Sequence, residues 1–349
     1  MVGMLKKHTL ALVLLAAFIL VPLTVGNTTD VHNVIIYILI YAMVGEAWNL
    51  ITGFTGQTSF GHAAYFGIGA YTSTIMLEYF YITPWIGMLV GGIIAAALAF
   101  IINFKMFKLK GHYFAIATLC VAEILKTIFS TWKWVGAGDG IALTPITALI
   151  PEASKSAVGK LAWLSLDVRN RLPFLFTTLA VFVIVFIICV ALENSKIGFY
   201  WKAIRESHEV AESIGINPRN YKLLAMCISA FIAAIGGTFF AQFFKYIDAI
   251  TVFPLSVSMI FVLVTVLGGI GNVYGPIIGA IIYYSLELIM RRLTGASGSG
   301  LDQIVFGALI VLVTCFEPKG IMGLIYKVKN RLFAKKAVQG GEADNGSNS

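Results

Sequence analysis

The feature that most constrains this chain is a succession of apolar stretches, each about as long as a helix that crosses a lipid bilayer. A spanning helix needs about 20 apolar residues, and 58% of the 349 residues are hydrophobic whereas 12% are charged. The chain is therefore predicted to be an all-α polytopic membrane protein with about ten transmembrane helices, or eight to ten because several stretches are short or rich in glycine. The predicted spans are 9–25, 33–51, 59–78, 84–104, 113–130, 172–192, 222–244, 254–268, 275–290 and 301–316.

The distribution of charge predicts the orientation of these spans. With the N-terminus in the cytoplasm and ten spans, most of the 25 Lys and Arg residues fall on the cytoplasmic side, where basic loops tend to stay. Both termini are then cytoplasmic, and Arg291 and Arg292 are the exception on the outer side. We interpret the span 9–25 as a retained helix, because the residues that follow it form a poor signal-peptide cleavage site. The net charge of +8 thus reflects topology and not nucleic-acid binding.

A charged, helix-forming segment, SKIGFYWKAIRESHEVAESIGINP (195–218), lies between two of the apolar spans. Its pattern predicts a helix from near Tyr200 to Gly215, where a glycine suits a C-terminal cap and Pro218 prevents continuation. Such a helix would be about 22 Å long. One of its faces would carry Ala203, Ser207, Val210, Ala211 and Ile214. An amphipathic helix outside the membrane favours docking to a partner, and the alternative is an ordinary solvated loop helix.

A second stretch places glycines and polar residues directly after an apolar span. In TGFTGQTSFGH (52–62), the glycines permit backbone breaks at membrane depth, which are tolerated where protein or a water-lined cavity satisfies the freed amides. We interpret this stretch as part of a translocation path, and close packing by small residues is the alternative. The candidate path residues are Gly53, Gly56, Gln57, Ser59, Gly61 and His62.

A third stretch, GIGNVYG (269–275), shares the spaced glycines and the single carboxamide side chain, here Asn272 in place of Gln57. This similarity predicts an internal repeat that relates spans 2–5 to spans 7–10. An offset of five spans would give the two halves opposite orientations, with the substrate path between them, as in many transporters. Gly271 and Asn272 therefore join the candidate path residues.

Three acidic residues, Glu46, Glu123 and Glu287, fall inside predicted spans. Each acid costs about 2.5–3.5 kcal/mol at the centre of a bilayer on insertion scales, so each is weighed as a functional or a paired group. Glu123 and Lys126 are three residues apart on one helix face and are spaced to neutralise each other. Glu46 is counted among the candidate path residues.

The sequence lacks the signatures of an enzyme. It contains no G-x-x-x-x-G-K-[ST] loop for nucleotide phosphates and no H-E-x-x-H zinc motif. The four cysteines lie singly in apolar spans without the spacing of a metal site: Cys120, Cys189, Cys227 and Cys315. We therefore expect no catalytic residue, and no metal or cofactor bound by this chain.

Five blocks in order along the chain carry a family resemblance. They are AWNLITGFTGQTSFGHAAYFGIGAY (47–71), LKGHYFAIATLCVAEILK (109–126), GAGDGI (136–141), SKIGFYWKAIRESHEVAESIGINPRNYKLLAMCISAFIAAIGGTFFA (195–241) and VLGGIGNVYGPIIGA (266–280). Together they resemble the permease subunits of branched-chain amino-acid ABC importers of the LivM type. The resemblance implies a multi-pass protein of a bacterial or archaeal plasma (inner) membrane. It also implies a paralogous LivH-type permease, two ABC ATPase subunits that use ATP and magnesium, and an extracytoplasmic substrate-binding protein as partners.

The resemblance implies roles for individual segments as well. The cytoplasmic segment 195–221 would couple to the ATPases through Ala203, Arg205, Glu206, Glu209, Ala211 and Gly215. Asp139, in the long extracytoplasmic segment 131–171, would belong to the translocation core. Leucine, isoleucine and valine would be carried by alternating access through a permease domain of residues 1–336. The tail 337–349 is poor in apolar residues, and its composition predicts a disordered cytoplasmic end.

Two alternatives stay open. A related ABC importer for urea or another small polar solute would keep the mechanism and change the substrate. An ion-coupled secondary transporter would need a clearer intramembrane acid or ion-site cluster than this sequence contains.

Overall fold

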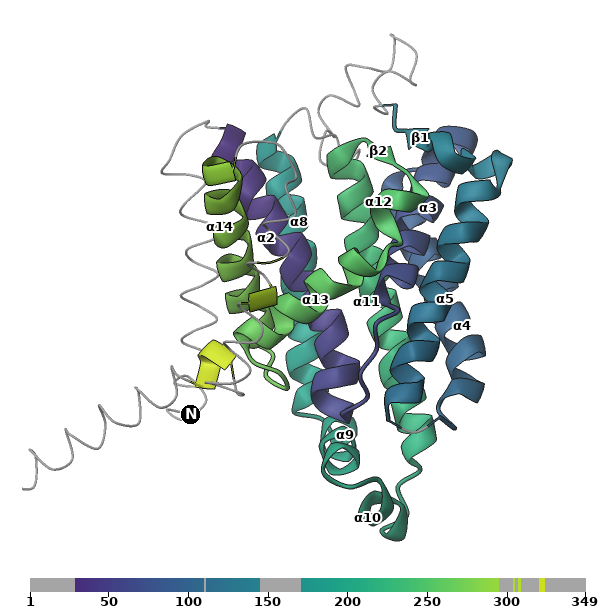
Figure 1. Ribbon diagram of the computed structural model, residues 1–349, viewed down its shortest axis with the longest axis vertical. Helices are drawn as coiled ribbons and strands as arrows, with labels where there is room; N and C mark the ends of the chain where they lie inside the picture. Colours follow the sequence, from purple (N-terminus) through teal and green to yellow (C-terminus); the bar gives the residue numbers. More distant parts are fainter. Residues whose placement is uncertain are drawn as a thin grey trace, which may run out of the picture.

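The computed structural model describes residues 29–109, 111–144, 171–294, 304, 307–308 and 320–323. This part of the chain is a bundle of long helices with two short helices projecting from one end (Figure 1). The long helices are α2 (Thr29–Trp48), α3 (His62–Phe80), α4 (Pro84–Met106), α5 (His112–Thr131), α8 (Arg171–Glu193), α11 (Pro218–Phe244), α13 (Leu255–Gly268) and α14 (Gly275–Thr294). We call the two projecting helices, α9 (Lys196–Glu206) and α10 (His208–Ser213), the elbow.

The helices confirm an all-α polytopic architecture. Among the described residues, six helical segments are long and apolar enough to cross a membrane, and Gly275–Met290 is a shorter apolar helix. Each of the eight predicted spans between 33–51 and 275–290 coincides with a long helix. The predicted spans 9–25 and 301–316 and the tail 337–349 lie outside the described residues, apart from isolated positions, so the total of ten spans stays a prediction.

Small residues bring α3 and α11 together in the middle of the bundle. A Cβ atom at Gly69 would lie 2.1 Å from the carbonyl oxygen of Ala234, and one at Gly237 would lie 1.9 Å from that of Phe66. The Thr238 hydroxyl donates to the Gly69 carbonyl at 3.2 Å across this contact. Helices associate in this way in lipid, where burial of apolar surface favours neither the free nor the packed state.

The helix α2 ends in an unusual way. Its last residues continue as a π-helical turn, η1 (Asn49–Gly53), and the chain then returns along the bundle to α3, which begins part-way up (Figure 1). Single π-helical turns are frequent at functional sites. The helix α13 also ends in a glycine-containing loop before α14 begins. We call residues 53–61 turn A and residues 269–275 turn B.

The two turns lie at the same end of the bundle. The side-chain oxygen of Asn49, beside turn A, accepts a hydrogen bond from the Gly271 amide of turn B at 2.8 Å. Each turn joins a helix that runs toward the elbow to one that runs away from it (Figure 1). An inverting axis would place equivalent turns at opposite ends, so the two motifs are not the counterparts that their sequences suggested. Spans 2 and 7, now α2 and α11, do run in opposite directions, and the repeat stays a prediction without support from the motifs.

The end opposite the elbow carries a small strand pair (Figure 1). The strand β1 (Ile141–Ala142) pairs antiparallel with β2 (Tyr246–Ile247), and Ile141 faces Ile247 in the register. Two 3₁₀ turns, η2 (Lys133–Val135) and η3 (Ala137–Asp139), lead from α5 into β1, and the short helix α12 (Ala249–Val252) follows β2. The ladder therefore ties the end of α5 to the end of α11. The predicted outer segment 131–171 is described up to Thr144 and again at Arg171.

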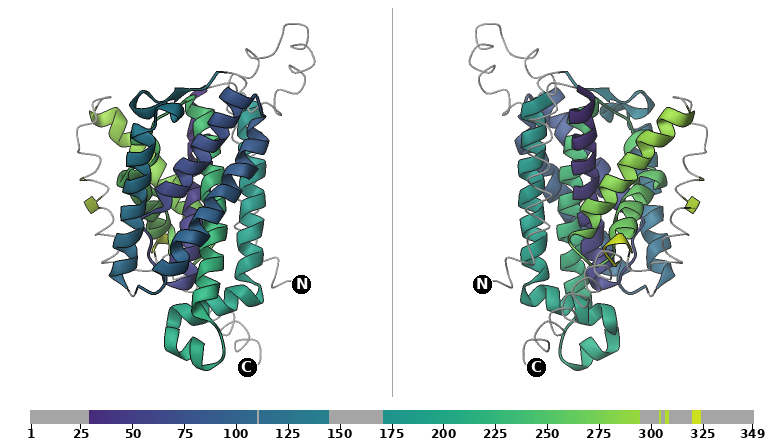
Figure 2. Two further views of the ribbon diagram at one scale, coloured as in Figure 1. Left: turned by 90° about the vertical axis from the view of Figure 1, so that its right-hand side faces the viewer. Right: turned by 90° about the vertical axis from the view of Figure 1, so that its left-hand side faces the viewer.

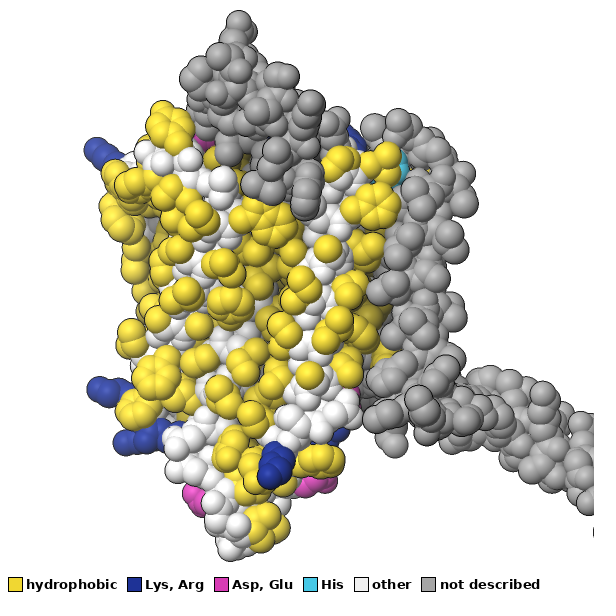
Figure 3. All heavy atoms as spheres, turned by 180° about the vertical axis from the view of Figure 1, so that it is seen from behind, with side chains coloured by type: hydrophobic (Ala, Val, Ile, Leu, Met, Phe, Trp, Pro, Cys, Tyr) yellow, Lys and Arg dark blue, Asp and Glu magenta, His cyan; other side chains and the backbone are white. Residues whose placement is uncertain are grey.

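One face of the bundle is suited to lipid. Seen from behind, hydrophobic side chains cover its middle, and Lys and Arg side chains lie above and below them (Figure 3). Figure 2 shows from the sides that the long helices run roughly side by side. The described helices thus form a membrane-embedded bundle, and the elbow projects beyond it.

Candidate functional site

The elbow is two short helices and not the single helix expected from Tyr200 to Gly215. The break falls at Ser207, whose backbone is extended (φ −156°, ψ 123°). The Ser207 hydroxyl accepts a hydrogen bond from the Val210 amide at 3.3 Å and so caps α10, as Ser195 caps α9 through the Gly198 amide. The predicted end is confirmed, because Gly215 has φ +85° and Pro218 opens α11.

The buried side of the elbow also differs from the predicted face. Trp201 is fully buried, and its indole N–H donates to the Tyr221 carbonyl of α11 at 2.9 Å. Ile204 and Ala211 pack with Ile216 in a small apolar cluster of their own. Two residues of the predicted face, Val210 and Ile214, are instead 61% and 66% exposed. The break at Ser207 rotates α10 relative to α9, so one helical face does not continue across both.

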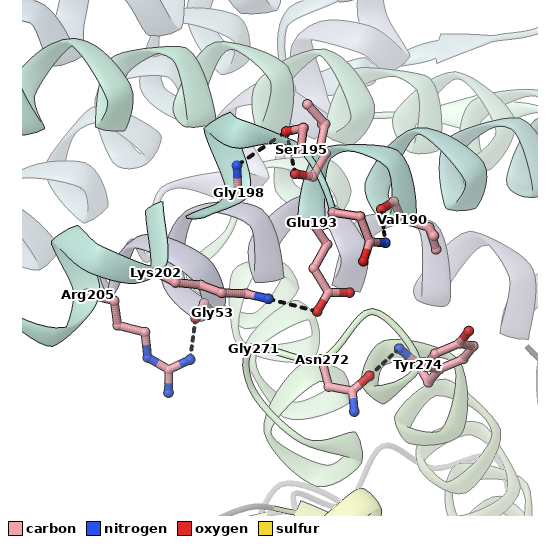
Figure 4. A network of polar contacts seen from close by, with 12 residues as sticks. Gly53, Val190, Glu193, Ser195, Gly198, Lys202, Arg205, Gly271, Asn272 and Tyr274 are labelled. Carbon is pink, nitrogen blue, oxygen red and sulfur yellow. Dashed lines mark hydrogen bonds and ion pairs between the residues drawn. The ribbon is translucent and has the colours of Figure 1, made fainter. Parts of the chain in front are cut away.

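Arg205 joins the elbow to both glycine turns. Its guanidinium Nη1 donates to the Gly53 carbonyl of turn A at 2.6 Å (Figure 4). A Cβ atom at Gly271, in turn B, would lie 2.2 Å from the same nitrogen, and one at Gly56 would lie 3.3 Å from the Arg205 Cγ. Since Gly53, Gly56 and Gly271 all surround one side chain, the structure gathers four predicted site residues from three distant segments.

Asn49, in the π-helical turn that leads into turn A, bonds to turn B. Its Oδ1 accepts from the Gly271 amide at 2.8 Å, and its Nδ2 donates to the Asn272 carbonyl at 3.0 Å. The Asn272 side chain in turn accepts from the Tyr274 amide and shapes turn B. A Cβ atom at Gly53 would lie 1.9 Å from the Asn49 Oδ1, so only glycine fits there. Asn49 is fully buried. The sequence interpretation missed it, although an amide residue near the end of the predicted span 33–51 was a visible signal.

Two lysines connect the elbow region to its neighbours. Lys202 of α9 forms an ion pair with Glu193 at the end of α8, with 3.0 Å between Nζ and Oε1 (Figure 4). Lys222, in the first turn of α11, donates to the Gln57 side chain of turn A at 3.0 Å. Turn A therefore contacts α11 through Gln57 and the elbow through the Gly53 carbonyl. The elbow is therefore bonded to α8 and to turn A, and it lies against turn B at Gly271.

Three further path candidates lie in the packed interior. The His62 ring bonds Ser59 Oγ at 3.1 Å and Ser229 Oγ of α11 at 2.8 Å, and all three side chains are buried. The backbone of Gly61 lies against α5, since a Cβ atom there would be 2.4 Å from the Thr118 carbonyl oxygen. These contacts agree with the packing alternative for Ser59, Gly61 and His62.

Glu46 is fully buried on α2, one turn before Asn49. The Asn49 side chain, one turn further on, is close enough to interact with its carboxylate. Cys189 and Glu193 of α8 are close enough to interact with it electrostatically. Glu46 thus lies on α2 close to the end of α8 from which the elbow begins.

The remaining predicted residues are distributed over two places. Glu206, Glu209 and Gly215 are exposed on the elbow, and Ala203 is half-buried beside its apolar cluster. Asp139 lies at the opposite end of the bundle, where its backbone carbonyl accepts from the Tyr246 hydroxyl at 2.9 Å. The structure therefore separates Asp139 from every other predicted site residue.

The predicted pairing within α5 is confirmed. The Lys126 Nζ lies 3.1 Å from the Glu123 Oε2, and both side chains are partly exposed on the outside of the bundle. No cluster of potential metal ligands occurs among the described residues.

Comparisons with known proteins agree on one family. The sequence profile of the branched-chain amino acid transport system, permease component, matches residues 31–314. The LivM permease protein of the high-affinity branched-chain amino acid transport system in Escherichia coli K12 is 28% identical over 305 residues, covering 84% of this chain and 70% of that protein. The LivH permease protein of Salmonella typhimurium is 23% identical, covering 81% and 91%. A probable LivH permease protein of Methanocaldococcus jannaschii is 24% identical, covering 88% and 96%. No solved structure gave a match.

Proposed function

The chain belongs to the family of branched-chain amino acid transport permease components, and from this premise we propose that it is the membrane-spanning subunit of an ABC importer for leucine, isoleucine and valine. The relatives named LivM and LivH are permease proteins of such systems. We propose a LivH-type paralogue as the second permease subunit. Two ATPase subunits, which use ATP and magnesium, and an extracytoplasmic substrate-binding protein complete the proposed complex.

We propose that the elbow faces the cytoplasm. Basic side chains at that end of the bundle support this orientation, because basic segments are retained inside. They are Lys105, Lys108, Lys196, Lys202, Arg205, Arg219 and Lys222. The strand pair and Asp139 then face outward, toward the binding protein.

The single observation that carries the proposal is the Arg205 contact with Gly53 and its close approach to Gly271. Docked ATPases would move the elbow when they close on ATP. Arg205 would pass that movement to the ends of α2 and α13, and the helices would change from an outward-open to an inward-open packing. The ATP-bound ATPases must favour one permease state by differential affinity, or no movement results. Exposed Glu206 and Glu209 offer the elbow's outer surface for docking.

Uptake into proteoliposomes tests the proposal. The chain is co-purified with the products of its neighbouring genes and supplied with leucine or urea, with and without ATP. ATP-dependent leucine uptake is the expected result. Uptake of urea alone would keep the mechanism and replace the substrate, whereas uptake driven by an ion gradient without the ATPases would overturn the assignment.

A further inference from the structure

The helix α5 presents an exposed face with an ion pair beside it. Only four residues of this helix are buried in the bundle, namely Phe114, Ala115, Thr118 and Ala122. Exposed positions recur every three or four residues and therefore form one face along its length. They are His112, Tyr113, Ile116, Cys120, Ile124, Thr127, Ile128 and Thr131.

An ion pair lies on the side of this face at membrane depth. Glu123 and Lys126 are 11 and 14 residues beyond His112, or about 17 and 21 Å along a helix about 30 Å long. Their side chains are 44% and 30% exposed. Within the described residues, the carboxylate and the ammonium group bond only to each other. Charged groups at this depth face a bundle interior or a water-filled cavity, because their insertion into lipid is costly.

Other outward-facing helices show what a lipid-facing surface looks like in this protein. The exposed residues of α8 are Ala180, Ile184, Ile187, Ile188 and Ala191. Those of α4, before its last turn, are Ile86, Leu89, Ile93, Ile94, Ala97, Phe100 and Ile101. Neither set contains a charged side chain. Figure 2 shows α5 and α8 on opposite sides of the bundle, so the ion pair of α5 and the apolar face of α8 point in different directions.

We propose that the exposed face of α5 lines the substrate path, and that Glu123 and Lys126 form a contact site for the two charges of an amino acid. This inference rests on the proposed function. Glu123 would accept from the α-ammonium group of the substrate, and Lys126 would donate to its α-carboxylate. The exchange replaces one ion pair with two and leaves the net charge of the site at zero. The neighbouring Ile116, Ile124 and Ile128 supply an apolar surface for a branched aliphatic side chain.

A native cysteine on the same face can report whether water reaches it. Cys120 is exposed and lies three residues before Glu123, whereas Cys189 is buried. A thiolate reacts with a charged, water-soluble methanethiosulfonate reagent only where water reaches it. If the face lines a path, such a reagent will reach Cys120, and a bound substrate will shield it.

The experiment uses the assembled transporter in proteoliposomes. Cys189, Cys227 and Cys315 are replaced by alanine, so that Cys120 is the remaining thiol. We expect the charged reagent to modify Cys120 and leucine to slow the modification. The matched control places the cysteine on the lipid face, as Ile93→Cys with Cys120→Ala, where only an apolar maleimide should react. An unreactive Cys120 would overturn the path assignment, and reaction without protection by leucine would overturn the contact site.

Transport kinetics provide the second test. Glu123→Gln and Lys126→Met each remove one charge-assisted contact, so each should raise the KM for leucine about tenfold or more. Ser130→Ala is the control on the same helix but outside this face, because its hydroxyl bonds the Thr127 backbone carbonyl at 3.0 Å. Unchanged KM values in both charge variants would contradict the contact site. The proposed function fails separately, if the unaltered complex takes up no leucine with ATP.

Discussion

At the scale of single residues, the site depends on one cation surrounded by glycines. Arg205 donates to the Gly53 carbonyl at 2.6 Å, and Gly56 and Gly271 leave the space that its side chain occupies. A hydrogen bond from a charged donor contributes about 1.5–3 kcal/mol, which is enough to bias a conformational equilibrium at the elbow. Lysine would supply charge without the planar fork of donors.

Replacing Arg205 should separate ATP hydrolysis from transport. In Arg205→Ala, we expect the complex to assemble and hydrolyse ATP while leucine uptake falls tenfold or more, because the elbow loses its bond to turn A. Both rates are measured in the same proteoliposomes. Lys196→Ala removes an exposed cation from the first turn of the same helix and should transport normally. Equal uptake by the two variants would contradict the role of Arg205.

Gly53 should tolerate no side chain. A Cβ atom there would lie 1.9 Å from the Asn49 Oδ1 and 2.8 Å from the Gly271 amide nitrogen. Overpacking of this kind costs about 1–3 kcal/mol, so Gly53→Ala should lower the midpoint of thermal unfolding in detergent. Gly138→Ala is the control, since nothing lies within 4 Å of its Cβ position. A wild-type midpoint for Gly53→Ala would show that the turns separate freely.

At the scale of elements, the elbow behaves as two capped helices with an extended residue between them. Trp201 fixes α9 to α11 through the Tyr221 carbonyl, and Ala211 is the buried residue of α10. The joint at Ser207 sets the two helices at different angles. The helix α10 is joined to α9 at this residue and to α11 through residues 214–217, and Ile216 of that connection packs against Ile204 and Ala211.

A proline in α10 tests this arrangement. Ala211→Pro removes the bond from the Ala211 amide to the Ser207 carbonyl, now 3.1 Å, and disturbs a fully buried position. We expect normal membrane insertion, with loss of leucine uptake and of its coupling to ATP hydrolysis. Val210→Ala, at an exposed neighbour, should change neither rate. Coupled transport by Ala211→Pro would mean that α10 is dispensable.

The positions of the helices could be predicted because span length and apolar composition are local properties of the sequence. The end of the elbow at Gly215 and Pro218 followed from local backbone preferences in the same way. The break at Ser207 could not be predicted, since its neighbours continue a helical pattern and its capping role depends on backbone angles. The burial of Trp201 likewise depends on α11, which lies elsewhere in the sequence.

At the scale of the whole molecule, the opposite ends of the bundle should lie on opposite sides of the membrane. In a background without native cysteines, Lys245→Cys beside the strand pair should react with an impermeant thiol reagent added outside right-side-out vesicles. Lys196→Cys on the elbow should react only after the vesicles are opened. The reverse labelling pattern would invert the proposed orientation.

The meeting of turn A with turn B illustrates what the sequence alone does not contain. Asn49 and Gly271 are 222 residues apart and bond to each other directly. The glycines and the two carboxamide residues made both turns candidates for the substrate path. A single sequence, however, does not show which distant segments contact each other. The same limit explains why Asp139 was grouped with residues from the other end of the bundle.

The Arg205 bond to turn A is made to a main-chain oxygen, which every amino acid possesses. The contact between Arg205 and turn A consequently does not depend on the side chains of the turn, provided that its glycines leave space for the Arg205 side chain. We therefore expect that the elbow can be exchanged between family members. Such an exchange would change which ATPase drives the permease and leave the substrate path unchanged.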